Sequence, residues 1–335
     1  GVYFILYFNV CNRLLFFCND MRNLKIFTKL FLSHTTLGLL SAILISYIFY
    51  TVISDALLER TLDQLSSINI LKKDLVESYF FRSQQNLEAL QVENKFGTIY
   101  HDLSASSGHS SENRDLTDIE NLCQLYNFKN LHVFDTHHIQ LFSTDKEMYP
   151  EGLLRRIDSV VSVEPDRIRI IDASHHAPDH QPLLFYYVPI HEMDELVGVV
   201  LVQENFQKLQ TILLENTGMG NTGESYIVGY DFTMRSRSRF FPDSLPGLIR
   251  VETDAVQNSF QGRSGQGIIN DYRGVSVLSA YRSIQNHDLK WVIISEIDEA
   301  EAMLPILRLR NYLIVVTLFI ILLTIVITYF LSNAI

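Results

Sequence analysis

The chain has 335 residues and a formal net charge of -11 at pH 7, with 27 Lys and Arg residues against 38 Asp and Glu residues. This acidic balance argues against a nucleic-acid-binding protein, which normally presents a basic face. Only three cysteines occur, and Cys123 is the only one in the polar middle of the chain. No disulfide is therefore expected within that part, and its fold must rest on its own apolar core.

Residues 1–29 are expected to form a cytoplasmic N-terminal segment. The chain begins at Gly1, and Met21 opens a short basic stretch, so we interpret residues 1–20 as an extension upstream of the true start. An additional interfacial or membrane-spanning helix over the same residues is the alternative. Basic residues on the flank of an apolar run are typical of the cytoplasmic side, and they precede the first run here at Arg13, Arg22, Lys25 and Lys29.

Two long uncharged stretches, residues 30–53 and 312–332, are predicted to be transmembrane helices. About 20 apolar residues in a helix suffice to cross the hydrocarbon core of a bilayer. Two spans place residues 55–310 outside the cytoplasm. Arg308 and Arg310 lie on the outer flank of the second span, against the usual charge bias, but that bias is weak beside long translocated domains. Two buried core helices are the alternative.

A stalk helix is predicted over residues 54–95, directly after the first span. Apolar side chains recur there at steps of three and four, which is typical of one face of a helix. This face is expected to pack on the domain behind it, to pair with a second subunit, or to do both along different parts of its length. Its members are Leu58, Leu62, Leu65, Ile68, Leu71, Leu75 and Tyr79.

The segment after the stalk is predicted to hold two similar α+β modules, over residues 96–205 and 206–300. Each begins with helix and continues with short runs rich in Val, Ile, Phe and Tyr, which predict strands. Residues 104–115 are expected to be a polar loop. A connecting helix over residues 301–311 then leads into the second span. The ten predicted strands are 131–135, 139–143, 167–172, 182–190, 196–203, 225–230, 233–238, 267–271, 275–282 and 290–297.

Three glycines, Gly218, Gly220 and Gly223, match the letters of the dinucleotide-binding fingerprint. That motif needs a strand before the glycines and a helix after them. Here a predicted helix precedes and a predicted strand follows, so we interpret Gly218 as ending the helix and the other two as shaping a turn.

Histidines are concentrated between His132 and His191, and three of them lie close together at His175, His176 and His180. Imidazole nitrogens bind zinc and titrate near neutral pH, so a metal site or a pH sensor are two interpretations of this loop. Tight spacing around Pro178 favours a plain solvated loop instead.

The region from residue 220 to residue 305 resembles the membrane-proximal half of double Cache sensor domains. The residues that carry the resemblance are GNTGESYIVGYDFTMRSRSRF (220–240), DYRGVSVLSAY (271–281) and WVIISEIDEAEAMLPI (291–306), and the stalk (60–80) resembles the helix that opens those domains. The resemblance implies two tandem PAS-like Cache modules with antiparallel five-stranded sheets on a long N-terminal helix. It also implies a bacterial receptor of the inner membrane.

In double Cache receptors the distal module usually holds the ligand, so the resemblance directs attention to residues 96–205. Candidate ligand contacts there are Arg169, Asp172, Tyr186 and Tyr187; only one of the two tyrosines can face a pocket, and we favour Tyr186. Amino-acid-binding members carry an Asp for the ligand amine where this chain has Gln203. The aromatic and Arg signature for the ligand carboxylate is not evident either, so we expect a small molecule that is not an α-amino acid.

In the proximal module, Tyr226, Arg235 and Tyr281 are candidates for a second pocket, with a structural role as the favoured alternative. An acidic run at Glu296, Asp298, Glu299 and Glu301 is interpreted as a solvated helix cap.

No catalytic motif and no cofactor site is recognised, so the chain is not expected to be an enzyme. We expect the sensory region of a homodimeric receptor that passes its signal through the second span to a cytoplasmic output region, of which residues 333–335 are the start. A histidine kinase is the favoured output; a chemotaxis transducer, a nucleotide cyclase or a phosphatase is the alternative. A domain that reads a partner protein, pH or a metal is the other reading.

Overall fold

The computed structural model describes residues 26–105, 112–137, 139–145, 166–177 and 179–333. It divides into two compact units. One contains the chain up to Arg60 and from Met303 onward, and the other contains Thr61–Ala302. The expectations for residues 1–20, for the basic residues as far as Lys25 and for residues 334–335 lie outside the described part of the chain.

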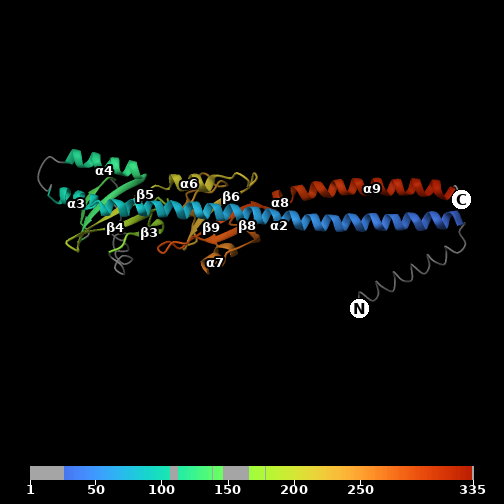
Figure 1. The fold of residues 1–335 in the computed structure, drawn as a ribbon, viewed down its shortest axis with the longest axis horizontal. Coiled ribbons are helices and arrows are strands. Elements are labelled where there is room, and N and C mark those ends of the chain that lie inside the picture. Colours follow the sequence, from blue (N-terminus) through green and yellow to red (C-terminus); the bar gives the residue numbers. More distant parts are fainter. Residues whose placement is uncertain (1–25, 106–111, 138, 146–165, 178, 334–335) are drawn as a thin grey trace. The chain divides into compact units, whose positions relative to one another are not determined.

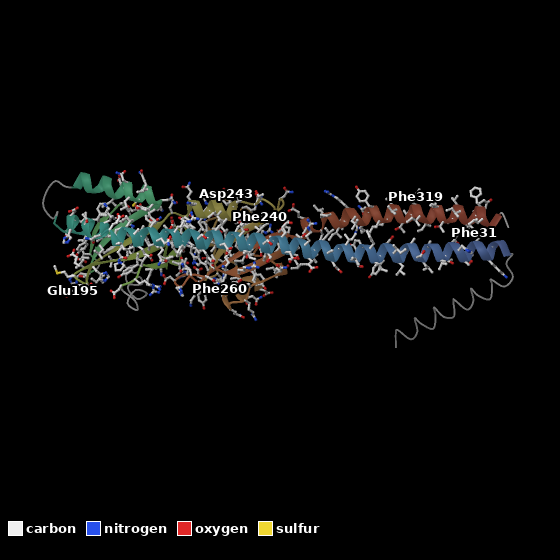
Figure 2. All side chains as sticks on the ribbon, viewed as in Figure 1. Phe31, Glu195, Phe240, Asp243, Phe260 and Phe319 are labelled. Carbon is white, nitrogen blue, oxygen red and sulfur yellow. The ribbon has the colours of Figure 1, made fainter. Side chains whose placement is uncertain are left out.

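The first unit consists of the early part of α2 (Ile26–Val92) and of α9 (Leu304–Asn333) (Figure 1). Both helices are long enough and apolar enough to cross a membrane. Side chains along them are mostly exposed, as with Phe319 (Figure 2). Ser46 and Thr317 join the two helices through their hydroxyl groups, 2.6 Å apart. Buried core helices would hide these apolar side chains, so the structure favours membrane spans.

The second unit begins with the rest of α2 and holds two antiparallel sheets. Its first sheet has the order β2-β1-β5-β4-β3. These strands are β1 (Phe128–Asp135), β2 (Gln140–Ser143), β3 (Arg169–Asp172), β4 (Leu184–Glu192) and β5 (Glu195–Glu204). Helices α3 (Lys95–Ala105) and α4 (Glu112–Tyr126) precede it, so the polar loop predicted over residues 104–115 is wrong at both of its ends.

The second sheet has four strands in the order β6-β9-β8-β7 and is preceded by α6 (Phe206–Leu214). Its strands are β6 (Glu224–Gly229), β7 (Gly265–Asn270), β8 (Ser276–Ser283) and β9 (Trp291–Asp298). The predicted fifth strand over residues 233–238 is wrong. That segment makes two isolated bridges, because it turns back at Phe232 (φ 63°) and uses the Ser236 hydroxyl to accept from Ile227 N.

The remaining helices of this unit are short. They are η2 (Ser174–His176), η3 (Pro246–Leu248), α7 (Asp254–Phe260) and α8 (Glu299–Ala302).

Helix α2 packs against both sheets with a face that includes polar residues. One apolar cluster joins its side chains Val76, Phe80 and Leu87 to strands of both sheets. Lys72 donates to the carbonyl oxygens of Leu213 and Glu215 at the end of α6, and Asn69 donates to Ile293 O in β9. The complete buried face is Leu65, Asn69, Lys72, Val76, Tyr79, Phe80, Ser83, Leu87 and Leu90.

The predicted apolar stripe therefore coincides with the packed face only in part. Leu71 and Leu75 are 61% and 43% exposed, because two polar residues, Asn69 and Lys72, occupy the turns that face the sheets. The spacing of apolar residues did not reveal the packed face, because a buried Lys or Asn breaks the apolar pattern in the sequence but still packs against the sheets.

The glycine-rich turn at residues 218–223 lies between α6 and β6 and binds an anion that belongs to the chain itself. Gly218 and Gly220 have φ of 81° and 67°, which a glycine adopts without strain. The Glu301 carboxylate accepts from Asn221 N at 2.8 Å and from Thr222 N at 2.7 Å. A Cβ on Gly220 would lie 2.7 Å from that carboxylate. This agrees with the interpretation of the glycines as a turn and leaves these two amide groups bound to Glu301.

Candidate functional site

The two faces of the first sheet have different partners. Alternate residues of its strands, such as Tyr186, Val188 and Val202, pack with α2. The residues between them form what we call the outer face, where a second apolar cluster includes Phe185, Tyr187 and Leu201. Strand alternation therefore turns Tyr187 toward the outer face and Tyr186 toward α2.

Tyr186 is enclosed between the sheet and α2. Its ring packs on Phe128, and its hydroxyl lies in a buried group with Ser83 and Glu204. Burial raises the pKa of Glu204, although the hydrogen bond from the Tyr79 hydroxyl opposes that rise. This group is part of the packed core, and Tyr187 is buried as well, at 3% exposure; the preference for Tyr186 as the ligand contact stays a prediction.

A polar cluster lies on the outer face near the β1 end of the sheet. Asn130 and Gln203 are direct cross-strand neighbours on β1 and β5. The Asn130 amide donates to Gln203 Oε1 at 2.7 Å and to Asp145 Oδ2 at 2.9 Å. Gln203 is 4% exposed. The position that departs from the amino-acid-binding pattern is thus linked, through Asn130, to a carboxylate.

His132 belongs to the same face, one step along β1 from Asn130. Its Nδ1 lies 2.8 Å from Ser143 Oγ, and its ring contacts Phe185 edge to face. His132 is 1% exposed, and burial lowers its pKa to about 4 against a smaller opposing effect of Asp145. The imidazole is therefore neutral near pH 7 and adds a polar, uncharged wall to the cluster. We call Asn130, His132, Ser143, Asp145 and Gln203 the outer-face cluster.

Arg169 and Asp172, two of the candidate ligand contacts, join the edge strand β3 to residues in and around the second sheet. Asp172 Oδ2 accepts from Arg235 Nε at 2.9 Å and from Trp291 Nε1 at 2.7 Å. Arg235 is 3% exposed and also binds Asp231. The candidates Asp172 and Arg235, assigned to two different pockets by sequence, are partners in one contact.

A second contact lies beside it. Asp288, in the loop before β9, accepts from Arg169 Nε at 3.1 Å and from Ile170 N at 3.1 Å, and it pairs with Arg167. The outward amide of an edge strand is thereby satisfied by a carboxylate. We call the contacts of Asp172 and Asp288 the inter-sheet clamp.

Tyr226 and Tyr281, the other proximal candidates, do not share an open pocket. Tyr226 is fully buried, and its hydroxyl donates to Glu296 Oε2 at 2.8 Å. Tyr281 is half-buried and packs against the apolar cluster of the second sheet, next to Gly265. Their positions fit the structural alternative for these residues.

The histidines of the loop contact other parts of the chain. His175 Nδ1 lies 3.9 Å from an Asp231 oxygen, and His180 contributes its carbonyl oxygen to Gly247 N. Among the residues that the structure describes, no three His, Cys, Asp or Glu side chains are grouped closely enough to hold a metal ion.

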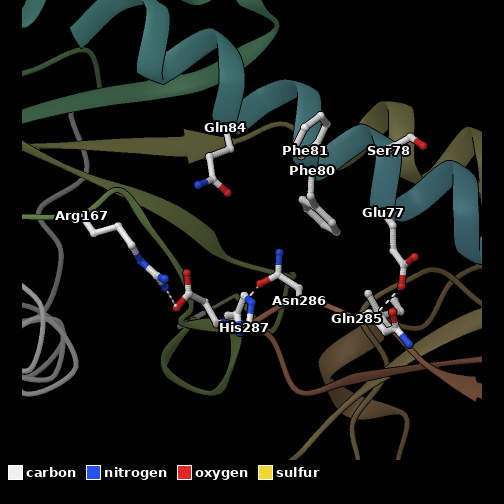
Figure 3. Close-up of a pocket in the computed structure, with 11 residues that line it drawn as sticks. Glu77, Ser78, Phe80, Phe81, Gln84, Arg167, Gln285, Asn286 and His287 are labelled. Atoms are coloured by element: carbon white, nitrogen blue, oxygen red, sulfur yellow. Dashed lines mark hydrogen bonds and ion pairs between the residues drawn. The ribbon is translucent and has the colours of Figure 1, made fainter. Parts of the chain in front are cut away.

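Two pockets open on the side of the first sheet that faces the helices. The one in Figure 3 has a volume of about 420 Å³ and lies between α2 and residues 284–288, with Arg167 at its rim. Its polar groups are occupied by one another: Glu77 accepts from Gln285 N, and Arg167 pairs with Asp288. The other, about 490 Å³, lies among α2, α3 and α4 and includes the exposed Leu125. Neither is lined by a candidate ligand residue.

Sequence reasoning missed the outer-face cluster apart from Gln203. In the run NLHVFD, Leu131 and Val133 alternate with Asn130 and His132, and this alternation of apolar and polar residues predicts a strand with one polar face. Burial of that polar face, which marks it as a candidate site, cannot be read from the pattern.

No protein-family model matches this sequence, and no curated protein matches it. Solved structures do. The Campylobacter jejuni chemoreceptor Tlp3 ligand-binding domain in complex with L-norvaline has a TM-score of 0.51 at 13% identity, covering 75% of this chain and 95% of that one. The Tlp3 sensory domain with isoleucine has a TM-score of 0.50 at 13% identity, covering 74% and 96%. The ligand-binding domain of the Pseudomonas aeruginosa amino acid chemoreceptor PctB with L-Gln has 0.46 at 15%, covering 72% and 93%.

This chain has the fold of a chemoreceptor sensor domain. The resemblance to extracytoplasmic double Cache domains is confirmed at the level of the fold, whereas the finer division into two tandem modules stays a prediction. The same structures correct the expectation about the ligand. We argued against an α-amino acid from Gln203 and from the missing aromatic and Arg signature, but domains of this fold are solved with such molecules bound, so that expectation is wrong.

Proposed function

We propose that this chain is the sensory region of a bacterial inner-membrane receptor and that the outer face of its first sheet binds an amino acid. The observation that carries the proposal is the outer-face cluster: hydrogen-bonded polar side chains on a sheet face, of which His132 and Gln203 are buried, in a fold used for ligand sensing. Burying a polar group is costly unless it is hydrogen-bonded, and the two buried members of the cluster, His132 and Gln203, have such partners in Ser143 and Asn130. We place the tandem modules as predicted, distal over 96–205 and proximal over 206–300.

The chemistry of the cluster fits the two ends of an amino acid. An ammonium needs acceptors, which Asp145 and Gln203 Oε1 provide. A carboxylate needs donors, and the Tyr187 hydroxyl lies on the same face. Gln203 is directly opposite Phe185 on β4, so Tyr187 is its diagonal neighbour, roughly 7–8 Å away.

Ligand binding on the outer face would be transmitted through β3. Arg169 is directly opposite Tyr187 across β3 and β4, and its guanidinium belongs to the inter-sheet clamp. Asp288 and Trp291 of the clamp lie just before and at the start of β9, the strand that continues into α8 and then, along the chain, into α9. A ligand must bind two arrangements of this path unequally to shift it, and a few kcal/mol is enough.

Binding is tested by titrating the full chain, in lipid nanodiscs, with a panel of L-amino acids. A binder at 100 times its Kd should raise the free energy of unfolding by about 2.7 kcal/mol. Asp145→Asn and Tyr187→Phe should weaken binding at least tenfold, whereas Tyr281→Phe, the matched control in the second sheet, should bind as the parent does. A panel without any binder, or an Asp145→Asn variant with unchanged affinity, would contradict the proposal.

The receptor is proposed to be a homodimer with a cytoplasmic output region. The exposed apolar residues Ile70, Leu71, Leu75 and Phe81 of α2 are available to a second copy of the chain. A histidine kinase is the first output to test, and a chemotaxis transducer or a cyclase the next. The full gene sequence decides between them, because each output has its own motifs; a stop codon directly after Ile335 would contradict this part.

A further inference from the structure

The second sheet contains two glutamates that face each other across neighbouring strands. Glu224 on β6 and Glu296 on β9 are direct partners in the antiparallel ladder, and both project to the side opposite α2, where Tyr226 and Ile294 lie. They are 5% and 3% exposed. The sequence interpretation of Glu296 as part of a solvated cap is therefore wrong. Glu296 is buried in β9, which is an inner strand of the sheet with β6 on one side and β8 on the other.

The contacts of the pair are almost all with neutral donors. Glu296 accepts from the hydroxyls of Tyr226 at 2.8 Å and Ser279 at 2.9 Å. Glu224 accepts from the Tyr272 hydroxyl and from Arg239 N, both at 2.7 Å. Hydroxyl donors stabilise a carboxylate, but they do not cancel its charge.

The cations near the pair are committed to other groups. The Arg273 guanidinium pairs with Asp271 and Asp298, and Arg239 donates its side chain to Gly223 O. Asp271 itself is 6% exposed and adds a third carboxylate to the surroundings. Within the described part of the chain, no ion pair joins Glu224 or Glu296 to a basic side chain.

Two buried carboxylates without a cation cannot both be charged at modest cost. Burial and a like charge each favour the protonated acid, and such effects raise the pKa of carboxyl groups by several units. Burial is the main cause that raises the pKa of Glu296 to about 8, with Asp271 and Glu224 adding to it against the hydrogen bonds from Tyr226 and Ser279. Burial also raises the pKa of Glu224.

We propose that the Glu224–Glu296 pair is a proton-binding site through which the second sheet responds to the pH of the extracytoplasmic side. The bound proton lies on Glu296, two residues before β9 ends and α8 begins. Loss of the proton places a charge inside the sheet at that junction. There the Asp298 amide is bound to Thr222 Oγ1, and Arg273 pairs with the Asp298 carboxylate. This role adds proton sensing to the ligand binding proposed above and does not depend on it.

The direction of the effect follows from the two pKa values of Glu296. In the unfolded chain a glutamate has a pKa near 4.3, below the value in the folded protein, so the folded state holds the proton more tightly. The stabilisation is complete below about pH 4 and is lost as the pH rises toward 8. Over that range the unfolding equilibrium constant should rise by up to about tenfold per pH unit.

Trp291 is the only tryptophan of the chain and lies on β9 itself, so its fluorescence reports on the strand in question. We would measure urea unfolding of the full chain in detergent by Trp291 fluorescence from pH 6 to pH 8. The parent should lose stability across this range, and Glu296→Gln should be flat. Glu252→Gln, an exposed residue in the same sheet's part of the unit, should keep the parental slope.

Tyr226→Phe provides a second test if Glu296→Gln fails to fold. It removes a hydrogen-bond donor to the charged Glu296 carboxylate, so the pKa of Glu296 should rise and the loss of stability should occur at higher pH. Glu224→Gln removes the neighbouring charge and should move it to lower pH. A parent whose stability does not change between pH 6 and pH 8, or shifts absent from both variants, would overturn the proposal.

Discussion

The two sheets bury titratable groups of opposite type on the faces turned away from α2. His132 in the first sheet is a base that burial keeps neutral, and Glu296 in the second sheet is an acid that burial keeps neutral. Folding therefore opposes the uptake of a proton in the first sheet and favours it in the second. The difference teaches that two sheets packed on one helix can have opposite pH responses through single buried residues on the faces turned away from that helix.

The largest expected effect tests whether the two sheets act as one body. Asp172→Ala removes the partner that the buried Arg235 and the Trp291 indole share. Breaking a buried pair from one side costs about 3–5 kcal/mol, so urea unfolding of the full chain should show a loss of that order, or two separate transitions. Removing the exposed pair of Arg250 and Glu252 with Glu252→Ala is the control, with a cost of about 0–1 kcal/mol. Equal losses would mean that the clamp contributes little.

The next largest effect is a loss of stability at low pH that depends on His132. The pKa of His132 is about 4 in the folded protein and near 6.5 in an unfolded chain, so the unfolded state takes up the proton first. Stability should fall as the pH drops from about 6.5 to about 4, by up to about tenfold in the unfolding constant per pH unit.

His132→Gln should remove this loss, whereas His101→Gln, at a largely exposed side chain, should leave it unchanged. Unfolding followed by circular dichroism at each pH measures both variants. If the His132→Gln variant loses as much stability in acid as the parent does, His132 is not the cause of that loss.

A third prediction concerns Lys72, which α2 places between the sheets. Burial lowers its pKa to about 8 against the smaller effect of Glu215, below the ordinary value of about 10.4. The folded state thus binds this proton less tightly, and stability should increase as the pH rises from about 8 to about 10.

Lys72→Met should abolish the alkaline increase and cost about 1.5–3 kcal/mol at neutral pH, because charged hydrogen bonds to Leu213 O and Glu215 O are lost. The exposed Lys208→Met is the matched control. An alkaline increase that persists in Lys72→Met would have to come from another group.

The smallest expected effect on folding distinguishes the two faces of α2. Leu71→Ala should change the free energy of unfolding by at most about 0.5 kcal/mol, since the side chain is 61% exposed. Leu65→Ala, at 3% exposure, should cost about 2–5 kcal/mol. Leu71→Asp combined with Leu75→Asp should lower the dimer fraction in analytical ultracentrifugation. An unchanged dimer fraction would assign the interface to another surface.

Much of the fold was predictable because its signals are local. The apolar runs that became α2 and α9, and the alternating strands of the first sheet, are set by side-chain periods within 10 to 25 residues. The second sheet lost a predicted strand because residues 233–238 bond through side chains, at Arg235 and Ser236, instead of through a ladder. Nothing in the letters of that segment separates the two outcomes.

The site was less predictable because its residues meet only in the folded chain. Asp172 and Arg235 are 63 positions apart and were placed in different pockets. Asp145 reaches Gln203 through Asn130, an arrangement that depends on the register of β1 and β5 and on the turn after β2. A position-by-position argument from Gln203 therefore missed the carboxylate that stands beside it.

The Glu301 carboxylate in the glycine-rich turn has a mechanical consequence. It holds α8 by four hydrogen bonds to Asn221 and Thr222: two from backbone amides, one from the Asn221 side-chain amide at 3.2 Å and one from the Thr222 hydroxyl at 2.6 Å. Hydrogen bonds weaken steeply with distance and angle, so such a fastening cannot stretch gradually. Movement of the start of α8 away from the turn would therefore break these hydrogen bonds together.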